Sequence, residues 1–141
     1  MLQIDFQSED FPAAGPVSNS FDSLQTTWDD LLWAAITVGR PNRFFVFRYG
    51  VASQYEALFR ISAVRMSLEQ ISPGARRLRR TQAAKSLDPS EKGAVNYFLG
   101  LTLCKLFADA RLNAPWLLHL DVFRPQLNPV LSGRSRPDLV G

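Results

Sequence analysis

The sequence has little of the chemistry that usually marks a disulfide-stabilised or thiol-dependent protein. It holds one cysteine in 141 residues, so no disulfide can form within the chain. Cys104 lies in a strongly apolar stretch without a nearby histidine, and we expect it to be a small buried core residue rather than a nucleophile. This cysteine usage is typical of a reducing compartment, which favours a cytoplasmic location.

Long hydrophobic runs are also missing. The two longest apolar stretches, 31–38 and 99–107, are interrupted by polar residues and are too short to span a bilayer. The N-terminus has neither the basic region nor the apolar region of a secretory signal, and no period of 20–50 residues indicates a repeat protein. We therefore expect no membrane association and no solenoid or propeller.

The residues that are present describe a globular protein with a modest basic charge. Hydrophobic residues make up 46% and charged residues 21%, which is enough to build a core. Thirteen arginines and three lysines carry the net charge of +3, and the arginines cluster at one place. Arg76, Arg77, Arg79 and Arg80 can track the phosphates of DNA or RNA. A solvated connector is the alternative.

Periodicity predicts several elements in the first half of the chain. Alternating apolar residues at 2–6 predict a short strand, and apolar residues at helical spacing predict a helix at 21–37 that ends before Gly39. The aromatic run at 44–49 favours a strand or an extended linker. A second helix is predicted at 51–70. The aromatic residues of both helices are expected in a core or an interface: Trp28, Trp33, Tyr55 and Phe59.

The second half begins with the clearest local signal. Asp88 suits a helix N-cap, Pro89 the first helical position and Glu91 the third, so a helix is predicted from here to about residue 112. Alternation then predicts a strand at 116–123, with His119 and Asp121 on one face. A last strand is predicted at 136–141, with nothing after it to pair with.

This order of a capped helix and two strands resembles the PD-(D/E)xK nuclease superfamily. The second strand of that family opens with Pro-Asp, as Pro137-Asp138 does here, and its first helix often bears a glutamate, as at Glu91. Three segments also resemble uncharacterised bacterial proteins in which a strand with Glu-Ala-Lys-Gly follows: Asp88-Pro89-Ser90-Glu91-Lys92, Leu118-His119-Leu120-Asp121 and Arg136-Pro137-Asp138-Leu139-Val140-Gly141.

The resemblance implies metal-dependent hydrolysis of nucleic-acid phosphodiesters. Glu91 and Asp138 would be catalytic, and Asp138 would bind Mg²⁺, which prefers oxygen ligands and generates hydroxide near neutral pH. The third strand, with its Glu-x-Lys, does not follow in this sequence. We therefore expect a partial domain that binds Mg²⁺ only if the site is completed and does not cleave nucleic acid alone.

Other interpretations of the same residues stay open. Glu91 is also explained as a capping carboxylate, Asp138 as a turn residue, and His119 with Asp121 as a solvated strand face. The alternative function is a non-catalytic module that binds a protein partner or assembles through an open sheet edge.

The expected fold is α+β. It divides into an N-terminal mainly helical region at 1–74, an Arg-rich connector at 75–87 and a partial restriction-endonuclease-like core at 88–141. We expect the three parts to form one compact domain.

Overall fold

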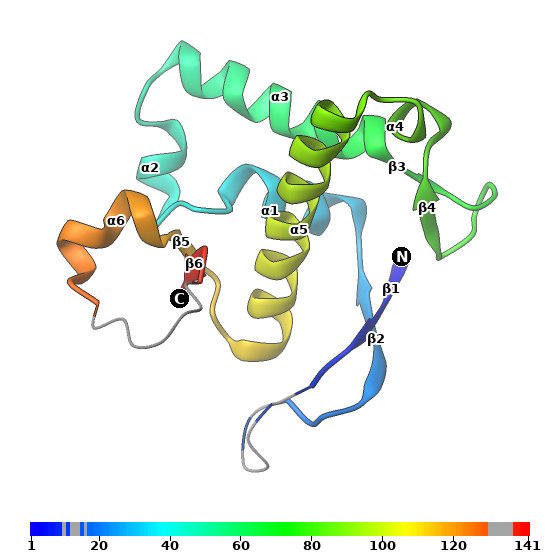
Figure 1. The fold of residues 1–141 in the computed structure, drawn as a ribbon, viewed down its shortest axis with the longest axis horizontal. Helices are drawn as coiled ribbons and strands as arrows, with labels where there is room; N and C mark the ends of the chain where they lie inside the picture. Colours follow the sequence, from blue (N-terminus) through cyan, green and yellow to red (C-terminus); the bar gives the residue numbers. More distant parts are fainter. Residues whose placement is uncertain (10, 12–14, 16, 130–136) are drawn as a thin grey trace.

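A computed structural model describes residues 1–9, 11, 15, 17–129 and 137–141 of the chain. The fold is α+β, with helices around three two-stranded antiparallel sheets in these residues (Figure 1). The elements are β1 (Leu2–Gln7), β2 (Phe21–Thr26), α1 (Trp28–Thr37), α2 (Arg43–Phe47), α3 (Val51–Ser67), β3 (Leu68–Gln70), β4 (Leu78–Arg80), α4 (Gln82–Lys85), α5 (Pro89–Leu112), β5 (Leu118–His119), α6 (Leu120–Leu127) and β6 (Leu139–Val140).

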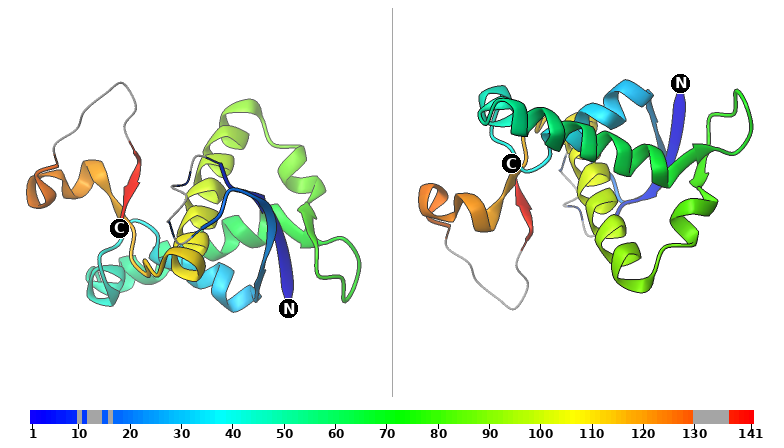
Figure 2. Two further views of the ribbon diagram at one scale, coloured as in Figure 1. Left: turned by 90° about the horizontal axis from the view of Figure 1, so that it is seen from below. Right: turned by 90° about the horizontal axis from the view of Figure 1, so that it is seen from above.

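The long helix α5 separates two groups of strands. The β1–β2 hairpin lies on one side of α5, and β5, β6 and α6 lie on the other (Figure 2). β1 and β2 pair from Leu2 opposite Thr26 to Gln7 opposite Phe21. β5 pairs with β6, with Leu118 opposite Val140. The strand predicted at the end of the sequence therefore does have a partner, because β6 pairs with the preceding strand, β5.

The hydrophobic core lies between α1 and α5. It draws residues from the segments 1–74 and 88–141, so both contribute to one core. Its buried members are Leu24, Leu31, Ala34, Ala35, Val64, Leu99 and Leu106. No helix in the described ranges is both long enough and apolar enough to cross a membrane.

The start of α5 confirms the predicted N-cap and the predicted first helical residue. Asp88 is the N-cap, Pro89 is the first helical residue, and the Asp88 carboxylate accepts hydrogen bonds from the backbone N–H groups of Ser90 and Glu91. These bonds lower the pKa of Asp88, and the bond from the N–H of Ser90 has the largest effect. The helix ends at Leu112, and Asn113 closes it in the left-handed conformation that asparagine tolerates.

The predicted helix at 21–37 was wrong over its first third. Residues 21–26 form β2, because pairing with β1 satisfies their backbone and buries Leu24 and Thr26 on one face. The helix begins one residue after Thr27, whose hydroxyl accepts from the N–H of Asp30 while the Asp30 carboxylate accepts from the N–H of Thr27. This reciprocal capping box fixes the start of α1.

Two predicted strands are largely helical. The aromatic run after Asn42 forms α2, because the Asn42 side chain caps it by accepting from the N–H of Phe45. Only Leu118 and His119 of the segment 116–123 are extended, and α6 follows at once. Phe123 then contacts Phe45 of α2, with ring centroids 5.9 Å apart, which favours the helical arrangement. His119 and Asp121 therefore share no strand face.

One cation is held inside the core by a single carboxylate. The Lys105 side chain is 1% exposed, and its ammonium donates to Asp109, one turn later on α5, at 3.1 Å. Asp109 itself is 45% exposed. A buried charge is costly without its counter-ion, so stability depends on this pair being complete.

Replacing Asp109 by Asn is expected to lower the free energy of unfolding by about 2–3 kcal/mol, because Lys105 would remain buried and unpaired. The double change Asp109→Asn with Lys105→Met should recover most of that loss, since it removes the charge and keeps the volume. Urea unfolding followed by circular dichroism measures both variants. Equal midpoints for Asp109→Asn and the unaltered chain would contradict this.

Candidate functional site

Asp138 lies at a mostly apolar hollow between α5 and β6. The hollow has a volume of about 370 Å³ and is lined by Tyr97, Gly100, Leu101, Cys104, Pro137, Asp138 and Leu139. The prediction that Cys104 is a buried core residue was wrong, because this cysteine faces outward from α5 and is exposed. Asp138 is exposed as well, and its backbone carbonyl accepts from the N–H of Leu120.

Glu91 does not line the hollow at Asp138. It precedes Tyr97, the first residue of α5 that lines the hollow, by six residues, which is about 9 Å along the helix axis. Among the described residues no three His, Cys, Asp or Glu side chains are grouped closely enough to hold a metal ion. Mg²⁺ is usually held by one or two carboxylates together with waters and substrate phosphates, so Asp138 supplies at most one protein ligand of such a site.

The arginine cluster lies on the β3–β4 hairpin, and part of its charge is already neutralised. Arg77 pairs with Asp5 of β1 at 3.3 Å, and Arg79 pairs with Glu69 of β3 at 2.9 Å. Arg80 donates to the side-chain oxygen of Asn96 on α5. Arg76 is exposed and makes no ion pair within the described ranges. The four arginines are therefore not one uniform basic patch.

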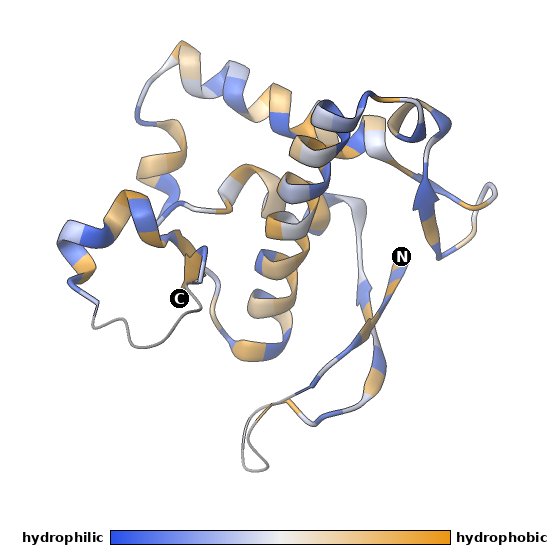
Figure 3. Ribbon diagram, in the orientation of Figure 1, coloured by the Kyte–Doolittle hydropathy of each residue, from blue (hydrophilic) through white to orange (hydrophobic). Residues whose placement is uncertain are grey.

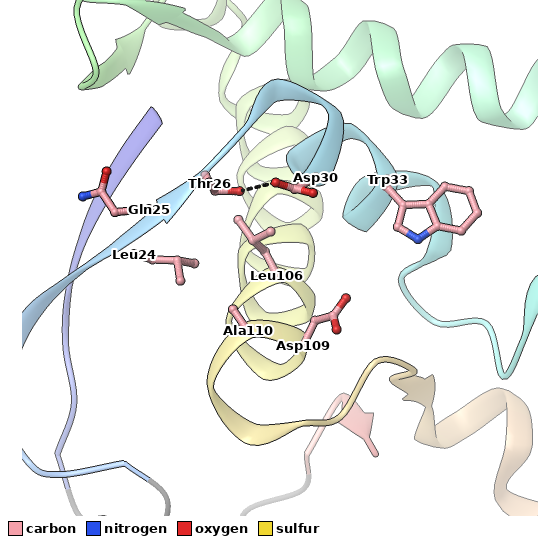
Figure 4. Close-up of a pocket in the computed structure, with 8 residues that line it drawn as sticks. All are labelled: Leu24, Gln25, Thr26, Asp30, Trp33, Leu106, Asp109 and Ala110. Carbon is pink, nitrogen blue, oxygen red and sulfur yellow. Dashed lines mark hydrogen bonds between the residues drawn. The ribbon is translucent and has the colours of Figure 1, made fainter. Parts of the chain in front are cut away.

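A second hollow lies between β2, α1 and α5 and contains two carboxylates (Figure 4). Its volume is about 250 Å³, and Asp30 and Asp109 are its acidic residues. Asp30 is engaged in the capping box of α1, where it also accepts from the Thr27 hydroxyl at 2.7 Å. Asp109 holds Lys105. Both acids thus have structural roles.

Arg60 is the main polar link between α3 and the rest of the molecule. Its guanidinium donates to the backbone carbonyls of Ala35 and Val38, at 2.9 and 3.2 Å, and to Glu56 at 2.8 Å. Arg40 also donates to the same Glu56 oxygen. Partial burial acts to raise the pKa of Glu56, but Arg60 and Arg40 together lower it below its usual range.

Because Arg60 faces inward, the apolar stripe of α3 faces outward. The inner face carries the buried residues Ser53, Val64 and Ser67. The opposite side carries four large apolar side chains that are 56–70% exposed, and we call it the outer face of α3: Val51, Tyr55, Leu58 and Phe59. Hydrophobic and hydrophilic segments alternate along this helix in Figure 3.

Sequence reasoning found the residues of this surface but not their exposure. Tyr55 and Phe59 lie at the i, i+4 spacing of a helix face, which predicts equally well a core stripe and an interface. No local signal in the sequence distinguishes the two, because an arginine such as Arg60 is more often exposed than turned inward. Phe47 and Tyr49, which precede α3 directly in the chain, are exposed as well.

His119 is packed against the loop that follows α1. A Cβ atom at Gly39 would lie 2.1 Å from the His119 ring, and Gly39 has a φ of +79° that favours glycine. Burial lowers the pKa of His119, and the positive charges of Arg60 and Arg40 lower it further, against the opposing effect of Asp138. The neutral imidazole is the form that this environment accepts.

Stability should therefore fall as the pH drops below the ordinary histidine pKa of 6.5. Above 6.5 the imidazole is neutral in both states and the stability is at its maximum. Below pH 6.5 the histidine becomes protonated in the unfolded chain while it is still neutral in the folded chain. The free energy of unfolding therefore decreases until the pH falls below the folded-state pKa. Urea unfolding between about pH 5 and 8 should show this slope, and His119→Gln should flatten it. An NMR titration of this histidine, with a midpoint at or above 6.5, would contradict the account.

Comparison with known proteins gives no guide to these sites. No family model, no curated protein and no solved structure matches this chain. The resemblance to the PD-(D/E)xK superfamily therefore stays a prediction. Support for a function comes from the contacts, burial and charges of the chain's own residues.

Proposed function

We propose that this chain is a non-catalytic assembly module and that the outer face of α3 binds a second copy of the chain. The observation that supports this most is the exposure of four large apolar side chains on one face of α3, while its inner face carries Arg60 with the small residues Ser53, Val64 and Ser67. Water-facing aromatic rings at this density are typical of a protein interface.

The size of the surface suits a stable pair. With Phe47 and Tyr49, the outer face of α3 exposes on the order of 700 Å² of side-chain surface, given that each aromatic residue has about 150–250 Å² to bury. The largest apolar patch of a typical monomer is about 300–600 Å². One partner in a standard interface contributes about 800 Å².

The chemistry of the surface favours a second copy as the partner. Between Val51 and Phe59 the outer face carries no charge, because the acidic residue of this stretch, Glu56, points toward Arg60 and Arg40. Arg48, which stacks on the ring of Tyr49 at 4.8 Å, is a charge at the edge of the enlarged surface, so two copies can meet about a two-fold axis without like-charge repulsion at its centre. A cytoplasmic location, expected from the sequence, belongs to the same proposal.

Light scattering coupled to size-exclusion chromatography should give twice the chain mass for the unaltered protein. Tyr55→Ser with Phe59→Ser should shift the mass to that of one chain, because removal of each central aromatic anchor weakens an interface at least about 30-fold. Tyr97→Ser, which removes an exposed ring from α5, is the matched control and should remain paired. A single-chain mass for the unaltered protein at all concentrations would reject self-association.

A second candidate function is part of a nuclease-like domain that is inactive alone. It is favoured by Asp138, which directly precedes β6, and by the antiparallel pairing of β6 with β5. Glu91 lies on the helix and Asp138 at the second strand, as in the resemblance, but α6 stands between β5 and β6, where the resemblance has a loop. Asp138 is the one carboxylate that lines its hollow, so a second protein ligand for a catalytic Mg²⁺ would have to come from elsewhere.

For this candidate, supercoiled DNA and single-stranded RNA incubated with the chain and Mg²⁺ should stay intact. One exposed carboxylate does not generate the hydroxide that attacks the phosphodiester. Gel electrophoresis of the products measures this. Magnesium-dependent cleavage that is lost in Asp138→Asn but kept in Asp109→Asn would show instead that the chain holds a complete active site.

A further inference from the structure

A hollow between β4, α4 and α5 brings together three positive side chains. Its volume is about 260 Å³, and it is lined by Arg80, Ala84, Lys85, Lys92 and Asn96. Arg80 ends β4, Lys85 ends α4 and Lys92 lies in the first turn of α5. Three separate elements therefore contribute one cation each, and no acidic residue lines the hollow.

The charges in this hollow are poorly neutralised by the protein. Among the residues that the structure describes, Arg80, Lys85 and Lys92 take part in no ion pair, in contrast to Arg77 and Arg79 on the same hairpin. Asp88 is the acid that interacts electrostatically with Lys92, and its carboxylate is engaged as the cap of α5. Asn96 supplies one neutral acceptor, to Arg80.

Arg80 carries a donor that the protein leaves unused. Its Nε–H is buried and has no hydrogen-bond partner. A buried, unsatisfied donor on a charged group costs free energy, about 1–3 kcal/mol or more. An anion in the hollow would neutralise the two lysines.

We propose that the hollow formed by Arg80, Lys85, Lys92 and Asn96 binds a phosphate group. A guanidinium offers several donors in a fixed plane that match phosphate oxygens, and lysines add charge without demanding one geometry. The phosphate can belong to a nucleic-acid backbone or to a free small anion. Both present negatively charged oxygens around a tetrahedral phosphorus. This site is separate from the outer face of α3 and does not depend on self-association.

The site differs from the basic patch expected from the sequence. That patch was the run of four arginines at 76–80, but Arg77 and Arg79 are held by Asp5 and Glu69. The folded chain instead joins the last of the four to lysines that follow 5 and 12 residues later in the numbering. The spacing in the sequence did not point to Lys85 and Lys92, because they lie on other elements than Arg80.

The test compares two variants that each lose two positive charges. Lys85→Gln with Lys92→Gln alters the hollow, and Arg77→Gln with Arg79→Gln removes the same charge from paired positions on the neighbouring hairpin. Fluorescence anisotropy with a labelled DNA duplex, measured over a range of salt concentrations, gives affinity and its salt slope. Amide NMR spectra recorded with inorganic phosphate report on the hollow directly. Circular dichroism checks that each variant is folded.

The proposal predicts that inorganic phosphate shifts the amide signals of Arg80, Lys85 and Asn96 in the unaltered chain. These shifts should disappear in the lysine variant and persist in the arginine variant. The bound phosphate group belongs to a nucleic-acid backbone if the duplex also binds and is displaced by inorganic phosphate. In that case the salt slope of duplex binding should fall by about two units in the lysine variant. If only phosphate binds, the source is a free anion. The proposal is overturned if phosphate leaves the three signals unchanged, or if both variants lose binding equally.

Discussion

The inward-facing guanidinium of Arg60 is the constraint on which the arrangement of the helices depends. The last carbonyls of a helix have no partner within it, and Arg60 supplies donors to two such groups at the end of α1. Glu56 neutralises the charge of Arg60, and the ring of Phe98 on α5 lies 5.7 Å from the guanidinium carbon. One side chain therefore ties α3 to both α1 and α5, and this contact decides which face of α3 meets water.

The orientation of α3 links the stability of the fold to its proposed function. With Arg60, Glu56 and Ser53 facing the interior, the aromatic stripe cannot also be buried, because the two sets lie on opposite sides of the helix. A monomer would expose that stripe at a cost in free energy. Pairing with a second copy removes the cost without any change in the fold, and it leaves the cationic hollow between β4, α4 and α5 free for a ligand.

The fold class and the elements with strong local signals could be predicted from the sequence. The Asp88 cap, the following proline and Asn113 specify α5 almost alone, because each acts within one turn of the helix. β2 and α6 could not be predicted, because their apolar residues suit either period. Pairing with β1 and packing of Phe123 on Phe45 decided between the two.

The candidate sites were less predictable than the elements, because they depend on which distant residues meet. Asp138 directly precedes a strand, as expected, but the spacing in the sequence does not reveal that Glu91 lies outside the hollow that Asp138 lines. The pairing of Arg77 and Arg79 with carboxylates on β1 and β3 is equally invisible before folding. Lys85 and Lys92 join Arg80 through the turn between α4 and α5, which no local pattern specifies.

The most direct test of the central claim is oxidative footprinting of Tyr55 and Phe59 by hydroxyl radicals at increasing protein concentration. If α3 faces outward and pairs with a second copy, both rings should react quickly in dilute solution and become protected as the concentration rises. The exposed Tyr97 should react at a constant rate throughout. Protection of Tyr55 and Phe59 at every dilution would contradict the outward orientation, and equal reactivity at every concentration would contradict the pairing.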